Sequence, residues 1–227
     1  AEATAIGGMV AVTFALFQFI CSPIVGNLSD RFGRRPVLLG SLFGFAADFL
    51  ILAFAQSLLW LFVARALTGI FGASNGPAQA SIADITPPEE RSRRYGLISA
   101  AFGLGFVMGP ALGGLLGEVG VRVPFYAAAA LALGNFVYGL FAFRETLPRD
   151  RRRAFRWQQA NPVGALLLVR RLPGIGGVSV VYFLWQVASL IYPMLWTYYA
   201  ADRYGWSPAV VGASLALVGA SMATMQI

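Results

Sequence analysis

The sequence predicts an all-α protein that crosses a membrane several times. Of its 227 residues, 58% are hydrophobic and only 12% are charged, whereas a soluble domain of this size carries about twice that share of charge. The apolar residues gather in runs of 20 residues or more, each long enough to cross about 30 Å of hydrocarbon as a helix. Short polar loops with arginines separate the runs, as is typical of connected membrane helices.

Seven such runs follow one another. The predicted spans are Ile6–Val25, Pro36–Ala55, Leu58–Ala83, Tyr95–Leu116, Val123–Phe143, Leu172–Ala201 and Ser207–Ile227. The sixth run is longer than a bilayer requires, so we expect it to be tilted or partly interfacial. Because the first and last runs lie almost at the ends of the sequence, we expect this chain to be a fragment of a longer protein.

The arginines predict the orientation and the domain boundaries. All 17 basic residues are arginine, and 14 of them lie in three alternating loops, residues 26–35, 84–94 and 144–171. Short basic loops stay in the cytoplasm, so we place these loops on the cytoplasmic side. Segment 144–171 carries eight arginines and predicts a cytoplasmic linker between an N-terminal helical half, 1–143, and the start of a C-terminal half, 172–227.

Composition also limits the chemistry. The chain has no histidine and one cysteine, so we expect no metal site and no internal disulfide. It carries no phosphate-binding loop and no nucleophile triad, so we expect neither an enzyme nor a cofactor. The net charge of +7 is explained by topology and anionic headgroups better than by nucleic acid. The expected partners are membrane lipid and a small molecule, and we expect a monomer.

The first basic loop combines glycines, an aspartate and arginines at close spacing. It reads Gly26-x-Leu28-x-Asp30-Arg31-x-Gly33-Arg34-Arg35. Asp30 can cap a helix or bond to an arginine, and Arg34 can pair with a carboxylate such as Asp84, which is expected at the same membrane surface. These groups predict a charge latch, whose strength depends on protonation and geometry. The alternative is that they only set topology, but topology requires neither the aspartate nor the glycines.

The fourth predicted span has small residues at every fourth position. They are Ala101, Gly105, Gly109, Gly113 and Gly117. Such a stripe lets another helix approach closely, and Pro110 can bend the helix because it removes a backbone hydrogen bond. Ordinary glycine packing is the alternative, although the run Gly-Pro-x-x-Gly-Gly, which ends at Gly114, favours a more specific role.

Two charged residues lie deep within the predicted spans. Asp48 lies seven residues before Ala55, and Arg65 lies seven residues after Leu58, so both are about 10 Å below the outer surface. A charge at the centre of a span costs roughly 2.5–3.5 kcal/mol, which makes each a functional candidate. We expect the two to pair or to share a substrate or proton, with a purely structural ion pair as the alternative.

Polar side chains on two spans are candidates to line a cavity. Asn75 and Gln79 are four residues apart and share one face of the third span. The sixth span has a polar and aromatic face, formed by Tyr182, Trp185, Gln186, Ser189 and Tyr192. For these aromatic residues, contact with lipid is the alternative.

The loop at residues 26–35 resembles motif A of the major facilitator superfamily, and the Gly-Pro-x-x-Gly-Gly run resembles its motif C. Within that superfamily the chain is similar to the tetracycline/proton antiporters along most of its length, for example at residues 82–86 and 124–130. The resemblance implies a twelve-helix fold of which this chain covers about helices 2 to 8. It also implies that Arg65 matches the motif B arginine, which is linked to proton coupling.

The same resemblance implies a function. It is the export of tetracycline-like or other amphipathic drugs across an inner (plasma) membrane, as in multidrug efflux and antibiotic resistance. The export is in exchange for protons, by alternating access and with the proton gradient as energy source. It further implies that Arg65, Asn75, Gln79 and the sixth-span face line the central cavity. Residues 74–79 depart from the tetracycline pattern, which leaves the substrate open. The alternatives are a transporter of a sugar or other metabolite and a transport-inactive membrane sensor.

Overall fold

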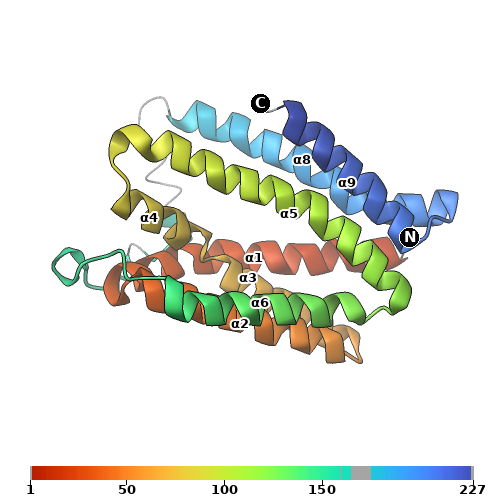
Figure 1. The fold of residues 1–227 in the computed structure, drawn as a ribbon, viewed down its shortest axis with the longest axis horizontal. Helices are drawn as coiled ribbons and strands as arrows, with labels where there is room; N and C mark the ends of the chain where they lie inside the picture. Colours follow the sequence, from red (N-terminus) through yellow and green to blue (C-terminus); the bar gives the residue numbers. More distant parts are fainter. Residues whose placement is uncertain (1, 159, 165–174, 226–227) are drawn as a thin grey trace. The chain divides into compact units, whose positions relative to one another are not determined.

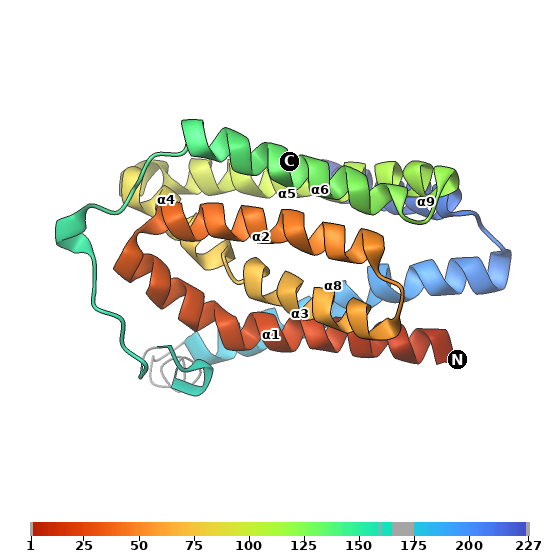
Figure 2. The same ribbon diagram turned by 90° about the horizontal axis from the view of Figure 1, so that it is seen from below.

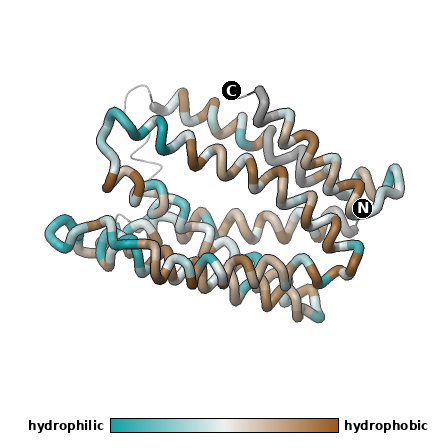
Figure 3. Tube along the Cα trace, viewed as in Figure 1, coloured by the Kyte–Doolittle hydropathy of each residue, from teal (hydrophilic) through white to brown (hydrophobic). Residues whose placement is uncertain are grey.

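The apolar runs form α-helices in the computed structural model, which describes residues 2–158, 160–164 and 175–225 (Figure 1). No β-strand occurs among these residues. The predicted all-α architecture is therefore confirmed. Figure 3 shows that hydrophobic residues follow the helix bodies and that hydrophilic residues gather at helix ends and connections.

The described residues divide into two compact units. One comprises residues 1–91 and 125–169, and the other residues 92–124 and 170–227. This division differs from the predicted halves because the helix over 91–119 groups with the C-terminal helices. We describe each unit by itself.

Among the described residues, five helices or helix pairs are long and apolar enough to cross a membrane. They cover Ala5–Phe32, Arg34–Phe54, Leu58–Ile85, Pro88–Val119 and Val123–Ala142. They correspond to the first five predicted spans. In the last two predicted spans the described residues hold only shorter apolar stretches, Gly176–Ala188 and Pro208–Ser221.

Among the described residues of the first unit, the structure gives the bounds of five α-helices and two short 3-10 turns. They are α1 (Glu2–Phe32), α2 (Arg34–Phe54), α3 (Leu58–Gly72), α4 (Asn75–Ile85), α6 (Val123–Ala142), η1 (Pro88–Glu90) and η2 (Arg149–Arg151). Helices α1, α2 and α3 pack against one another, and α2 also lies beside α6 (Figure 2). The rings of Phe43 and Phe136 join α2 to α6, with centroids 5.5 Å apart.

Close packing in this unit depends on small residues. A Cβ atom built on Gly69 of α3 would lie 2.5 Å from the backbone oxygen of Phe14 in α1. Such proximity brings two backbones into contact, which is how membrane helices gain packing energy without a hydrophobic driving force.

The third predicted span is not one helix but two. Helix α3 ends at Gly72 and α4 begins at Asn75, because Pro77 has no N–H and sits in the first turn of the new helix, where none is needed. The break leaves the Gly72 carbonyl without a helical partner, and the Gln18 side chain donates to it at 3.3 Å. A polar residue of α1 thus satisfies the backbone at the break.

The described residues of the second unit form three helices. They are α5 (Arg91–Val119), α8 (Ile175–Tyr204) and α9 (Pro208–Met225). Gly205, with φ of +63°, turns the chain from α8 into α9. Near this turn Trp196 Nε1 donates to Ser214 Oγ at 2.9 Å, and the Glu118 carboxylate at the end of α5 accepts the Ala209 N–H at 3.2 Å. An acid at this helix N-terminus satisfies a free amide and complements the helix dipole.

Candidate functional site

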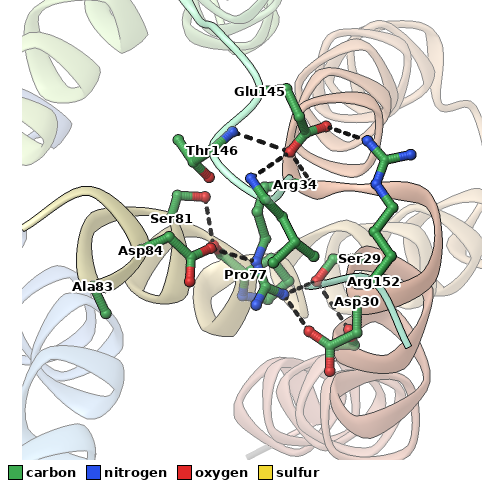
Figure 4. A network of polar contacts seen from close by, with 12 residues as sticks. Ser29, Asp30, Arg34, Pro77, Ser81, Ala83, Asp84, Glu145, Thr146 and Arg152 are labelled. Carbon is green, nitrogen blue, oxygen red and sulfur yellow. Dashed lines mark hydrogen bonds and ion pairs between the residues drawn. The ribbon is translucent and has the colours of Figure 1, made fainter. Parts of the chain in front are cut away.

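Arg34, the first residue of α2, is the centre of a polar network that joins three helices of the first unit (Figure 4). Its Nη1 atom donates to Asp30 Oδ1 and to Ser29 Oγ, each at 2.6 Å, and its Nε atom donates to Asp84 Oδ2 at 3.2 Å. Arg34 is only 8% exposed. We call Ser29, Asp30, Arg34 and Asp84 the Arg34 network.

The network depends on a tight turn where the sequence predicts a longer polar loop, residues 26–35. Helix α1 continues to Phe32 and α2 starts at Arg34, so only Gly33 separates them. Because α1 extends this far, Asp30 lies in its last turn and is placed against Arg34, four residues later. Gly33 has φ of +105° and ψ of 162°, a region that side chains essentially exclude.

Glu145 is a member of this region that sequence reasoning missed. Its Oε1 atom accepts three backbone N–H groups, from Arg34 at 2.8 Å, Leu147 at 3.0 Å and Thr146 at 3.1 Å. Its Oε2 atom pairs with Arg152 Nη2 at 3.5 Å. A Cβ atom on Gly33 would overlap this carboxylate. The only sequence signal was an acid in an arginine-rich linker, which does not reveal what it binds.

Two further contacts hold the start of the predicted linker against α1. The backbone N–H of Arg153 donates to the Asp30 carbonyl at 3.0 Å, and that of Arg156 donates to Asn27 Oδ1 at 3.3 Å. On the neighbouring helix, Arg35 Nη2 donates to the Leu140 carbonyl at 2.6 Å. Segment 145–156 is therefore bound along the α1–α2 turn, rather than being a free connection.

The remaining loop candidates lie outside the Arg34 network. The guanidinium of Arg31 lies 5.0 Å from the Phe32 ring centroid. Gly26 is helical, its carbonyl accepts the Ser29 hydroxyl at 2.9 Å, and a Cβ atom there would meet nothing within 4 Å. These two residues contribute no charged partner to Arg34.

Asp48 lies in the body of α2 and is fully buried. Its Oδ2 atom accepts the Thr68 hydroxyl at 2.5 Å, and its Oδ1 atom has no hydrogen-bond partner among the described residues. The charge of Arg65, which lies one turn before Thr68 on α3, attracts that of Asp48. No hydrogen bond or ion pair joins the two side chains among the described residues. The expected ion pair between Asp48 and Arg65 is therefore not formed among the described residues. The side chain that bonds to Asp48 is Thr68 instead.

The polar candidates for a cavity belong to different units. Asn75 and Gln79 are exposed on α4 in the first unit, while Tyr182 is exposed and Gln186 half-buried on α8 in the second. Tyr182 lies beside Trp185, with ring centroids 6.0 Å apart. The side chains of Ser189 and Tyr192 lie outside the described residues. A shared substrate cavity stays a prediction.

On α5, the helix contact is offset from the predicted stripe. Cβ atoms on Gly105, Gly109 or Gly113 would meet nothing within 4 Å, whereas one on Gly114 would lie 2.5 Å from the Pro208 carbonyl oxygen. From the other side, a Cβ atom on Gly212 of α9 would overlap the carbonyl oxygen of Pro110. Of the antiporter candidates, Pro110 and Gly114 therefore face α9, and the other three face open space in this unit.

The chain is similar in sequence to known membrane transport and resistance proteins. Residues 2–227 match the model of the Major Facilitator Superfamily. Tetracycline resistance protein, class C, of Escherichia coli is 42% identical over 93% of this chain and 53% of that protein. Multidrug resistance protein 2 of Bacillus subtilis (strain 168) is 28% identical over 97% of this chain and 56% of that protein.

A solved structure agrees with these matches. The crystal structure of the human organic anion transporter MFSD10 (TETRAN) superposes with a TM-score of 0.78 at 28% identity, over 97% of this chain and 55% of that one. The chain therefore spans about half the length of the curated relatives it matches.

Proposed function

The chain belongs to the Major Facilitator Superfamily, and on that basis we propose that the full-length protein exports amphipathic drugs across the inner membrane in exchange for protons. The observation that carries this proposal is 42% identity, over 93% of the chain, to a protein named for tetracycline resistance. Similarity to a multidrug resistance protein supports a drug substrate that is not restricted to tetracycline.

The Arg34 network supplies a device for alternating access. Its guanidinium joins α1, α2 and α4 through acceptors at 2.6 to 3.2 Å, and it is nearly buried. A buried charge of this kind is stable only while its acceptors are in place. In the proposal the network holds one conformation and separates when the two helical halves rock about a central site, with the arginine-rich loops on the cytoplasmic side.

Asp48 is the candidate proton carrier in this chain. It is fully buried and one carboxylate oxygen has no partner among the described residues, so that oxygen is available to take up a proton. Thr68 holds the other oxygen, which fixes the carboxylate in either protonation state. Inward proton movement through such a group would drive export, and an intramembrane carboxylate is the group type that proton relays use.

The test is drug-induced proton release from inside-out vesicles that contain the full-length protein. We expect Asp48→Asn to abolish proton release and drug accumulation. Asp150→Asn removes a carboxylate from an exposed position in η2 and should leave both at wild-type levels. Wild-type exchange by the Asp48→Asn protein would remove Asp48 from the mechanism.

Organic anion transport is a second candidate. It is favoured by the likeness to the human organic anion transporter and by Arg65, a half-buried cation within α3 that makes no ion pair among the described residues. Competition in the same vesicles separates the two functions. Under the drug proposal a cationic amphipathic drug competes with tetracycline and an aromatic organic anion does not, whereas the reverse result supports the anion.

A further inference from the structure

A pocket of about 750 Å³ lies beside the Arg34 network, between the α1–α2 turn, the end of α6 and segment 145–156. One part of its lining is apolar and includes Phe32, Leu39 and Leu140. Phe32 and Leu140 are 51% and 39% exposed, and all three residues belong to helices that can cross a membrane. This part of the pocket is therefore suited to an apolar group.

The other part of the lining is cationic. It carries the side chains of Arg35, Arg149 and Arg152 against one acid, Glu145. Glu145 is already occupied, because it accepts three backbone N–H groups and pairs with Arg152. The exposed side chain of Arg149 makes no ion pair or hydrogen bond within the described part of the chain. The pocket thus has an excess of positive charge.

Two of the arginines that line the pocket also have a donor without an acceptor. The Nε atoms of Arg35 and Arg152 are buried and have no hydrogen-bond partner among the described residues. Buried N–H groups are almost always paired in folded proteins, so such a group calls for an explanation. An oxyanion in the pocket would balance the charge of these arginines, because a guanidinium presents N–H groups in a geometry that matches phosphate oxygens.

We propose that this pocket binds the phosphate of an anionic phospholipid. The phosphate oxygens accept from Arg35, Arg149 and Arg152, and an acyl chain lies over Leu39 and Leu140. The lipid is the occupant that uses both parts of the pocket, since a free phosphate ion would leave the apolar part empty. Basic residues next to a membrane helix attract anionic headgroups in the same way.

Lipid binding here would stabilise the neighbouring Arg34 network through Glu145. Arg152 contacts Glu145, and Glu145 accepts the backbone N–H of Arg34. A phosphate that neutralises Arg35 and Arg152 would hold segment 145–156 against the α1–α2 turn. Lipid binding itself requires only that the chain lies in a membrane, so it can be measured without drug transport.

The experiment is native mass spectrometry of the delipidated full-length protein, titrated with phosphatidylglycerol, phosphatidylcholine or inorganic phosphate. We expect tight binding of phosphatidylglycerol and weak binding of the other two. Arg149→Gln should weaken phosphatidylglycerol binding about fivefold, and Arg149→Lys should retain most of it. Arg151→Gln is the matched control, since Arg151 lies in the same 3-10 turn but does not line the pocket, and it should bind like the wild type.

Three results would overturn the proposal. Equal affinity for phosphatidylcholine would show that the anionic charge is not recognised. An equal loss in Arg151→Gln and Arg149→Gln would reduce the effect to diffuse surface charge. If inorganic phosphate displaced phosphatidylglycerol at the same concentration at which the lipid binds, the pocket would be a site for a free anion rather than for a lipid.

Discussion

Two buried charged residues of the first unit, Arg34 and Asp48, differ in how fully they are hydrogen-bonded. Arg34, where α1 meets α2, has three acceptors on three side chains, at 2.6, 2.6 and 3.2 Å. Asp48, in the middle of α2, has one donor, Thr68, and one oxygen without a partner among the described residues. Both are more than nine-tenths buried, so burial does not distinguish them.

The two side chains differ in whether they can change their protonation state. A guanidinium stays protonated in proteins and must keep its acceptors, so Arg34 is suited to hold helices together. A carboxylate with a free oxygen can gain or lose a proton without a rearrangement of its neighbours, so Asp48 is suited to exchange. The following predictions break or sharpen this comparison, from the largest expected effect to the smallest.

Arg34→Ala should give the largest effect. It leaves Asp30 and Asp84 without their shared cation, and loss of one partner from a buried ion pair costs about 3 kcal/mol or more. The measurement is the free energy of unfolding of the full-length protein in detergent. Arg31→Ala is the control, because Arg31 is exposed and its guanidinium lies over the Phe32 ring, and it should cost less than about 1 kcal/mol. Equal losses would refute the central role of Arg34.

Gly33→Ala should destabilise by about 2 kcal/mol, since its φ of +105° is strained for any side chain and a Cβ atom would overlap Glu145. Gly26→Ala is the matched control in the same segment. Its Cβ atom would meet nothing, and alanine is favoured within a helix, so stability should be kept or raised. Unfolding midpoints in denaturant compare the two, and a Gly33→Ala midpoint at the wild-type value would contradict the strained turn.

Thr68→Val should cost about 1.5 kcal/mol, because it removes the one donor to the buried Asp48. Thr68→Ser keeps the hydroxyl and should lose only packing. If both variants unfold at the same denaturant concentration, then the hydroxyl contributes nothing and the contrast between the two buried charges is weakened.

Glu145→Gln should have the smallest effect, below about 1 kcal/mol. The amide oxygen can still accept the N–H groups of Arg34, Thr146 and Leu147, and only the partly exposed ion pair with Arg152 is lost. Glu145→Ala removes the acceptor as well and should cost more. Thermal shifts of the two proteins, measured together, separate acceptor from charge, and identical shifts would argue against the acceptor role.

Much of the fold could be predicted from the sequence, because membrane helices leave a local signal. Twenty apolar residues must form a helix in lipid, since every backbone group needs an internal partner, and five predicted spans recur as helices. Membership of the superfamily was also predicted correctly. The break at Gly72 was not predicted, because it depends on Pro77 together with Gln18 from another helix.

The same distinction holds for the site. Residues 26–35 and Asp84 could be singled out because charges are rare between apolar runs, and the structure brings Arg34, Asp30 and Asp84 together. Glu145 could not be found in this way. It is 111 residues from Arg34, and an acid among arginines in a linker looks like any solvated charge.

The sequence by itself thus determined the helical membrane architecture, the family and the residues of the charged turn. Hydrophobic length and arginine placement act within one segment, so they can be read without the rest of the chain. Only the tertiary structure decided that Thr68 rather than Arg65 bonds to Asp48, that Gly114 rather than Gly113 faces α9, and that Glu145 closes the turn. Each of these depends on the rotation of one helix against another, and a shift of one residue turns a helix by about 100°.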